Sequence, residues 1–342
     1  MRRKYIGGEF DDLASIEFIK NEEMIHTPIF PEKVDHRNKS FFETATDSFA
    51  AILNECSEYS KGNTTLWIPS HYCMETITRM EKKVRKSFHK RYFGSISEVN
   101  KEAGLNVVLI NHFNEFNAAL LDVIEKLKKE EYIVIEDMVH APFDQKNTTA
   151  HYSFNSMRKV ADIEVSVCYG LNEIAEPSSM PSDYFLSKKA AANLKSKYFQ
   201  TQEKELETQY LEGFQKAEHS LNRKGIHPVY NEELKRFFRT DWDSLKEKRE
   251  VNYRSLLFRI NAVTDLEPLS GKYMYLITKA GNRNELRTSL FSKGIFPVIH
   301  WPDSHAELKN ETISFHIDQR YSESDMQRTA DEITQFYSLK HA

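Results

Sequence analysis

The chain has 342 residues, and its 47 Lys and Arg residues are slightly outnumbered by 51 Asp and Glu residues, which gives a net charge of −4. Because basic residues are not in general excess, non-specific binding to nucleic acid is not expected. No apolar run reaches the roughly 18 residues that a membrane-spanning helix needs, so no membrane partner is expected. A chain of this length can form one large core and a second, smaller domain.

The cysteine and histidine patterns argue against a metal site. Cys56, Cys73 and Cys168 are scattered, and the 13 His residues form no His-Glu-x-x-His motif. The odd number of cysteines fits reduced thiols. The amino terminus, Met1-Arg-Arg-Lys-Tyr, lacks the apolar stretch of a secretion signal. We therefore expect no metal and a cytoplasmic location.

The first clear element is a polar turn that leads into a helix at residues 43–53. Phe49, Ile52 and Leu53 recur at helical spacing after Thr44-Ala-Thr46. Such a helix entry binds phosphate well, because backbone N–H groups are free and the helix dipole is positive there. An ordinary N-cap formed by the Thr, Asp and Ser residues would explain this turn equally well.

Short apolar runs at residues 66–69, 106–110 and 132–135 are typical of buried strands. Residues 117–129, between the last two runs, carry apolar side chains at helical spacing. Strand, helix and strand in this order form a βαβ unit. The pattern therefore predicts a mainly parallel sheet.

Three reactive side chains follow the strand predicted at 132–135. Asp137 stands where the apolar run stops, His140 comes three positions later, and Lys159 lies in a polar, Ser-containing turn. A group at the carboxyl end of a parallel strand points into a crevice. A Lys amine can form a Schiff base with an aldehyde, and a buried Asp can hold a pyridine nitrogen protonated. Together they describe a pyridoxal-phosphate site, although singly Asp137 also fits a helix N-cap and Lys159 a solvated side chain.

The second half of the chain predicts connecting helices and a small domain. Residues 186–238 are rich in Lys and Glu with helical periodicity, which predicts long helices that connect the domains and help to form a dimer. A strand at 273–278 and a helix at 285–291 follow, and Gly294 suits the C′ position of that helix. We expect residues 1–240 to form a large cofactor-binding domain and residues 241–342 a small C-terminal domain.

Six segments in a fixed order resemble the DegT-like sugar aminotransferase family of fold-type-I pyridoxal-phosphate enzymes, from Ile6 to about Tyr337. The segments are Ile6-Gly-Gly-Glu-Phe10, Ile68-Pro-Ser-His-Tyr-Cys73, Val134-Ile-Glu-Asp-Met-Val-His-Ala141, Ser156-Met-Arg-Lys159, Gly294-Ile-Phe-Pro-Val-Ile-His-Trp-Pro302 and Ile317-Asp-Gln-Arg-Tyr321. The resemblance implies a three-layer α/β fold with a mainly parallel large-domain sheet and a smaller C-terminal α/β domain.

The resemblance also implies roles for the reactive residues. Lys159 would hold the cofactor as a Schiff base and then act as general acid and base. Asp137 would pair with the pyridine nitrogen, and His140 would lie near the phenolic oxygen of the ring or over Asp137. Arg158 would neutralise the cofactor phosphate or form a structural ion pair.

Further residues would bind the cofactor phosphate, its ring and the substrate. Ala45, Thr46 and Ser156 would anchor the phosphate, with Ser153 as the competitor of Ser156. Cys73 stands where relatives carry the aromatic residue that stacks on the ring, so this contact would pass to Tyr72 or His71, unless Tyr72 only packs under the next helix. His300 would lie at the substrate pocket or simply pack against aromatic neighbours.

Two departures from the family pattern concern glycines. The turn Thr44-Ala45-Thr46 stands where relatives have Ser-Gly-Thr or Ser-Gly-Arg, and Asp162-Ile-Glu-Val-Ser-Val167 stands where relatives have a Pro- and Gly-rich turn. These departures motivate an alternative function, in which the chain keeps the fold but acts as a binding or scaffold protein. The retained Asp137, His140 and Lys159 argue for catalysis.

The function that the resemblance implies is a pyridoxal-phosphate aminotransferase. It would move an amino group from an amino acid, with glutamate as the expected donor, to a keto-sugar linked to a nucleotide, in the biosynthesis of surface polysaccharide or another glycan. A homodimer is expected, because sites in the family are built from two subunits. Dehydration of the sugar by a related enzyme would need a histidine in place of Lys159, so the sequence argues against it.

Overall fold

The computed structural model describes residues 5–13, 16–20, 30, 33–34, 37–60, 62–269 and 271–340. Contacts divide the chain into two compact units. The larger unit contains Phe10–Ser70 and Met74–Asp241, and the smaller unit contains Met1–Glu9, His71–Cys73 and Trp242–Ala342. Each unit is described by itself below.

The larger unit is built on a sheet of eight strands in the described part of the chain. Their order across the sheet is β1-β2-β8-β7-β6-β5-β3-β4. The strands are Lys33–Val34 (β1), Arg37–Phe42 (β2), Thr64–Pro69 (β3), His89–Phe93 (β4), Leu105–Asn111 (β5), Ile133–Asp137 (β6), Tyr152–Phe154 (β7) and Ser166–Tyr169 (β8).

Strand directions place several strand ends at one edge of this sheet. β4, β3, β5, β6 and β7 are parallel neighbours, and β8 runs antiparallel to both β7 and β2. In the register, Asn111 pairs with Asp137, and Asp137 pairs with Phe154. The prediction of a mainly parallel sheet is confirmed. The residues that follow β5, β6 and β7 therefore leave the sheet at its carboxyl edge.

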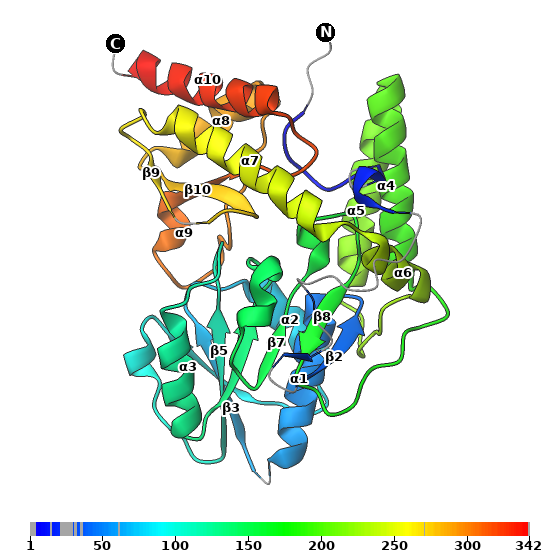
Figure 1. Ribbon diagram of the computed structural model, residues 1–342, viewed down its shortest axis with the longest axis vertical. Helices are drawn as coiled ribbons and strands as arrows, with labels where there is room; N and C mark the ends of the chain where they lie inside the picture. Colours follow the sequence, from blue (N-terminus) through cyan, green and yellow to red (C-terminus); the bar gives the residue numbers. More distant parts are fainter. Residues whose placement is uncertain are drawn as a thin grey trace. The chain divides into compact units, whose positions relative to one another are not determined.

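Helices of the larger unit follow the strands in the predicted alternation (Figure 1). They are Ala45–Tyr59 (α1), Met74–Glu81 (α2), Leu120–Lys129 (α3), Asp183–Thr201 (α4), Lys204–Ser220 (α5) and Asn231–Arg239 (α6). Short 3-10 helices are Ile16–Phe18 (η1), Ile96–Glu98 (η2), Pro142–Asn147 (η3) and Met157–Lys159 (η4).

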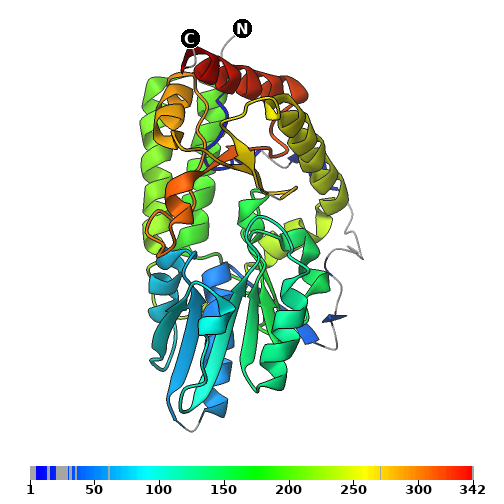
Figure 2. The same ribbon diagram turned by 90° about the vertical axis from the view of Figure 1, so that its left-hand side faces the viewer.

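The long helices predicted within residues 186–238 are present as α4 and α5. Both views show them side by side (Figures 1 and 2). Their apolar contact contains Ala191, Ala192, Tyr198, Tyr210 and Phe214. A Cβ atom at Gly213 would lie 2.8 Å from the Cβ of Ala191, so the glycine permits the close approach of the two helices.

The smaller unit packs helices around a three-stranded antiparallel sheet of order β11-β10-β9. Its strands are Glu267–Pro268 (β9), Tyr275–Lys279 (β10) and Thr312–His316 (β11), and its helices are Trp242–Ile260 (α7), Arg283–Ser292 (α8), Leu308–Glu311 (α9) and Glu323–Lys340 (α10). The core includes Leu256, Leu276, Leu286, Phe315 and Ile333. Gly294 follows the C-cap residue of α8 with φ of 70°, which confirms the predicted C′ position.

Candidate functional site

Asp137 is the last residue of β6 and is 5% exposed. Its Oδ1 accepts a hydrogen bond of 2.8 Å from the backbone N–H of Val139. The preceding Glu136 projects to the opposite face of the strand, because side chains alternate along a strand. There its carboxylate is bound by His112 Nε2 and by the backbone N–H groups of Thr149 and Ala150, all at 2.9 Å. Glu136 is therefore a structural carboxylate, and Asp137 is the acid at the carboxyl edge.

His140 lies in the turn that follows β6 and is buried. Its ring stacks on the ring of Phe113, with centroids 5.3 Å apart and planes 29° apart. Phe113 follows β5, the parallel neighbour of β6. The histidine is thus held among residues that leave neighbouring strands at the edge where Asp137 lies.

Lys159 lies in the segment that leaves β7 at the same edge. Met138 N–H donates a 2.8 Å hydrogen bond to the carbonyl of Phe154, which fixes β7 beside the end of β6. Ser156 then begins the single turn of η4, and Lys159 ends it with an exposed side chain. The structure therefore brings Asp137 and the Ser156–Lys159 turn to adjacent strand ends.

The first turn of α1 belongs to the same edge. Phe42, the last residue of β2, pairs with Ser166 of β8. The hydroxyl of Ser166 lies 2.7 Å from the hydroxyl of Ser48 in α1 and donates a 2.5 Å hydrogen bond to the carbonyl of Asn155. The start of α1 is thereby tied to the segment between β7 and Lys159.

Ala45 and Thr46 are the first two residues of α1, and both are half-buried. Thr44 is the N-cap, and its hydroxyl accepts from Asp47 N–H at 3.2 Å. Within the described part of the chain, no group accepts a hydrogen bond from the backbone N–H groups of Ala45 and Thr46 or from the hydroxyl of Thr46. Ala45 has no positive φ, so the backbone there does not require the glycine of the family pattern.

Two buried carboxylates flank this helix start, and each has its own cation. Asp47 and Lys83 form an ion pair of 2.9 Å with side chains 0% and 1% exposed. Glu43 pairs with Arg223 and accepts a hydrogen bond from Ser182. Burial raises the pKa of Glu43 against the opposing effect of Arg223. Because Lys83 and Arg223 are paired with these carboxylates, the groups at the start of α1 that could donate to a bound anion are uncharged N–H and O–H groups.

Lys83→Met is expected to lower the free energy of unfolding by about 3 to 5 kcal/mol, because it leaves the carboxylate of Asp47 buried without its cation. Urea unfolding measures the change. Lys82→Met is the matched control, since the neighbouring Lys82 is exposed and donates a hydrogen bond to Asn222. Equal effects of the two substitutions would contradict the importance of the buried pair.

The two serines proposed for the phosphate differ in their contacts. Ser153 is buried in β7, and its hydroxyl lies 3.3 Å from both Gln145 Nε2 and Thr148 Oγ1. The buried Ser156 makes no side-chain hydrogen bond within the described residues. These contacts favour Ser156 over Ser153 as a donor to a ligand.

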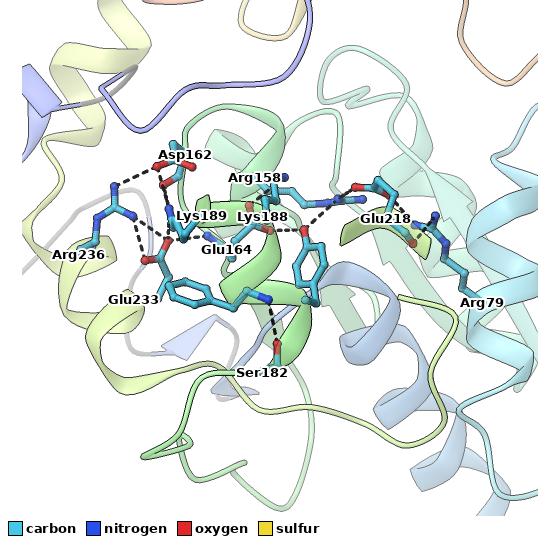
Figure 3. A network of polar contacts seen from close by, with 12 residues as sticks. Arg79, Arg158, Asp162, Glu164, Ser182, Lys188, Lys189, Glu218, Glu233 and Arg236 are labelled. Atoms are coloured by element: carbon cyan, nitrogen blue, oxygen red, sulfur yellow. Dashed lines mark hydrogen bonds and ion pairs between the residues drawn. The ribbon is translucent and has the colours of Figure 1, made fainter. Parts of the chain in front are cut away.

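The charge of Arg158 is neutralised within the larger unit. Arg158 Nη1 lies 2.6 Å from Glu218 Oε1 and donates a 3.1 Å hydrogen bond to the hydroxyl of Tyr184 (Figure 3). Two roles were proposed for Arg158, neutralisation of the cofactor phosphate and a structural ion pair. The contact with Glu218 is the structural ion pair.

The segment after Lys159, where the family that the sequence resembles has a Pro- and Gly-rich turn, contains two buried carboxylates (Figure 3). Asp162 binds Lys189 of α4 at 2.8 Å and Arg236 of α6 at 3.4 Å, and Glu164 binds Lys188 of α4 at 2.9 Å. No residue from 160 to 167 has a positive φ, so this backbone needs no glycine. Ion pairs with α4 and α6 hold the segment instead.

Asp162→Asn is expected to flatten the dependence of stability on pH between about 4 and 6. Asp162 is 2% exposed, and burial raises its pKa from 3.8 to about 6 against the effect of Lys189 and Arg236. Between about pH 4 and 6, Asp162 is protonated in the folded state but ionised in the unfolded chain. The free energy of unfolding of the wild type therefore falls as pH rises through this window, by at most about 2 to 3 kcal/mol.

The measurement is urea unfolding at pH 4, 5 and 6 for the wild type and Asp162→Asn. Asp122→Asn is the control, because Asp122 lies exposed on α3. A variant that retains the full pH slope of the wild type would show that Asp162 does not titrate in this window.

The other predicted residues, Tyr72 and His300, belong to the smaller unit. Tyr72 is fully buried, and its ring centroid lies 5.8 Å from that of Trp301. The His300 ring meets Tyr275 edge-on at 4.8 Å, which is the aromatic packing that the sequence left open as an alternative. His71 lies 4.7 Å from Trp301, and burial lowers its pKa to about 4, so its ring is neutral at pH 7.

Sequence reasoning missed the residues that hold the Lys159 segment. Glu218 lies 60 positions beyond Arg158, and Tyr184 lies 26 positions beyond it. In the sequence both belong to helices with many charged residues, whose charges are mostly solvated. A partly buried ion pair such as Arg158 with Glu218 can be recognised only from the tertiary contacts.

Comparison with solved structures identifies the fold. PseC of Helicobacter pylori, an aminotransferase involved in the biosynthesis of pseudoaminic acid, matches with a TM-score of 0.62 and 12% identity over 98% of this chain and 99% of that chain. The chain has the fold of the sugar aminotransferases. No protein-family profile matches the sequence, and no curated protein does.

Two further solved structures agree. DesI, solved in the presence of its TDP-sugar product, has a TM-score of 0.62 and 12% identity over 96% of this chain and 90% of that chain. S. venezuelae DesV, in complex with a ketimine intermediate, has a TM-score of 0.61 and 12% identity over 97% of this chain and 90% of that chain. The predicted fold class, a fold-type-I α/β transferase, is confirmed.

The residues at the carboxyl edge fit the cofactor of this fold. Asp137 is a fixed, buried acid suited to a pyridine nitrogen. The N–H groups of Ala45 and Thr46 and the hydroxyls of Thr46 and Ser156 are donors suited to a phosphate. Among the described residues, no group of three His, Cys, Asp or Glu side chains is placed to hold a metal ion.

None of the helices in the described part of the chain has the length and apolar character needed to cross a membrane.

Proposed function

We propose that this protein is a pyridoxal-phosphate-dependent aminotransferase that transfers an amino group to a keto-sugar. The observation that carries the proposal is the pairing of two strand ends: the buried carboxylate of Asp137 ends β6, and the turn that bears the exposed amine of Lys159 follows β7. The fold shared with PseC, DesI and DesV supports it.

When bound, the cofactor supplies an aldehyde that condenses with amines and a ring that accepts electrons. Asp137 holds a negative charge where a protonated ring nitrogen is needed, and Val139 N–H fixes its orientation. Lys159 would provide the amine that holds the cofactor, and it would be the base that removes and returns a proton at the carbon that carries the amino group. His140, whose ring stacks on Phe113, would lie near the phenolic oxygen of the cofactor ring or over Asp137.

The proposal also covers the sugar substrate, the amino-group donor and the assembly of the protein. The keto-sugar is nucleotide-linked, glutamate is the donor, and the product enters surface polysaccharide or another glycan. The TDP-sugar named with DesI supports the nucleotide linkage. The protein acts in the cytoplasm as a homodimer, with Tyr72 and His300 at the ring and the substrate, respectively. Sedimentation of the purified chain tests the dimer.

The experiment that tests the function is cofactor capture followed by a substrate panel. Added pyridoxal phosphate should turn the protein yellow, and borohydride should fix the cofactor to Lys159, as read by peptide mass spectrometry. Nucleotide-linked keto-sugars with glutamate, glutamine or alanine then identify the substrate and donor. A protein that stays colourless with added cofactor would overturn the proposal and favour a binding or scaffold protein.

A further inference from the structure

The turn that bears Lys159 is a short element that both backbone and side-chain contacts hold in place. η4 is a single 3-10 turn, closed by hydrogen bonds from Lys159 N–H to Ser156 at 3.2 Å and from Val160 N–H to Met157 at 2.9 Å. Met157 N–H also donates to the carbonyl of Val165 at 2.8 Å. So short a 3-10 helix has weak hydrogen-bond geometry. Side chains from outside the turn can therefore add to the contacts that fix its orientation.

The side-chain anchor nearest to Lys159 is the preceding residue, Arg158. Its guanidinium is held by Glu218 of α5 at 2.6 Å and by the hydroxyl of Tyr184 of α4 at 3.1 Å. Tyr184 donates to Glu164 at 2.5 Å, beyond the turn. The turn is thus anchored on both sides through α4, and its link to α5 runs through Arg158.

Glu218 is the residue on which this anchor depends. Its second oxygen, Oε2, binds Arg79 Nη1 of α2 at 3.0 Å, so the carboxylate bridges α2 and the Lys159 turn (Figure 3). Burial opposes the ionisation of Glu218, but Arg158, Lys188 and Arg79 outweigh burial and hold its pKa far below the ordinary value. Glu218 is therefore a permanent negative charge, which compensates the cation next to Lys159.

We propose that Glu218 is a positioning residue for Lys159, which acts through Arg158 to fix the turn and to balance the positive charge beside the reactive amine. The inference rests on the proposed function of Lys159 and adds a residue from α5 to the site. Glu218 is not proposed to touch any reacting atom. Its proposed influence on Lys159 passes through the ion pair with Arg158, so substitutions at the two partners separate it from a general effect on packing.

Opposite charge changes at the two partners give the sharpest test. Glu218→Gln removes a negative charge that pairs with Arg158, which disfavours the ammonium form of Lys159. Arg158→Met removes the positive charge next to Lys159 and favours the ammonium form. Each change is expected to move the midpoint of the pH dependence of Lys159 acetylation by about 0.3 to 0.5 pH unit at low salt, downward for the first and upward for the second.

The double variant Glu218→Gln/Arg158→Met should return the midpoint to that of the wild type. Loosened packing would not produce shifts of opposite sign that cancel. The labelling uses acetic anhydride on the full chain without added cofactor, read by peptide mass spectrometry. Glu212→Gln is the matched control, because Glu212 lies exposed on the same helix.

A second measurement is the concentration of pyridoxal phosphate needed for half-maximal borohydride trapping at Lys159. Glu218→Gln and Arg158→Met should each raise it about tenfold, and the double variant should raise it no further, because both act through one pair. Arg158→Lys keeps the charge and should retain the wild-type acetylation midpoint, which preserves the test if Glu218→Gln does not fold.

The outcomes separate the two proposals. Shifts of the same sign in both single variants, or shifts no larger than that of Glu212→Gln, would overturn the role of Glu218. A wild-type protein that traps no cofactor at Lys159 would overturn the proposed function. The acetylation midpoints would still decide whether Glu218 acts on Lys159, because that measurement needs no cofactor.

Discussion

Lys159→Arg is expected to reduce amino-group transfer by at least about a thousandfold. Arginine keeps the positive charge and the length of the side chain, but its guanidinium stays protonated and can neither condense with an aldehyde nor accept a proton. Because the Lys159 side chain is exposed, the fold should be retained. The measurement is the rate of glutamate-dependent amination of the keto-sugar identified by the panel.

The control for this substitution is Lys146→Arg, at an exposed position in η3 of the same unit. It should leave the rate within about twofold, as is usual for a surface change. Borohydride trapping should also disappear from Lys159→Arg and persist in Lys146→Arg. Activity that survives in Lys159→Arg would mean that another amine performs the transfer.

The strand pattern in the sequence was enough to place Asp137 correctly. Apolar runs at 106–110 and 132–135 correspond to β5 and β6, and Asp137 ends β6 as expected. The helix between them was also predicted, although it begins at Leu120 and not at residue 117. Such features depend on local periodicity, which a single sequence displays directly.

The contacts of individual polar residues could not be predicted in the same way. Ser153 and Ser156 were interchangeable in the sequence, and only the structure shows that Ser153 meets Gln145 and Thr148. The distinction depends on η3 packing against β7, a relation that leaves no local pattern. The same holds for Glu218, whose partner Arg158 lies on another element.

The two departures from the family glycines have a common physical explanation. Glycine is required where φ is positive or where another backbone comes close. Neither Ala45 nor the residues from 160 to 167 have a positive φ. At both places buried ion pairs provide the structure: Asp47 with Lys83 at the start of α1, and Asp162 with Lys189 after Lys159. Loss of these glycines is therefore compatible with an ordered site.

Asp137→Asn is expected to lower the rate of transfer by about a hundredfold or more, with little effect on stability. The asparagine oxygen can still accept the hydrogen bond from Val139 N–H, so the turn after β6 should remain in place. What is lost is the negative charge that keeps a ring nitrogen protonated. The effect should therefore fall on kcat more than on the binding of the sugar.

Steady-state kinetics and urea unfolding on Asp137→Asn measure the two expectations together. Asp122→Asn, at the exposed position on α3, is the control and should change neither quantity. Asp137→Glu tests position, since it restores the charge one methylene further from β6, and it should recover only part of the rate. Full activity in Asp137→Asn would show that the charge at the end of β6 has no part in the chemistry, and the acid of this site would then have to be sought elsewhere in the chain.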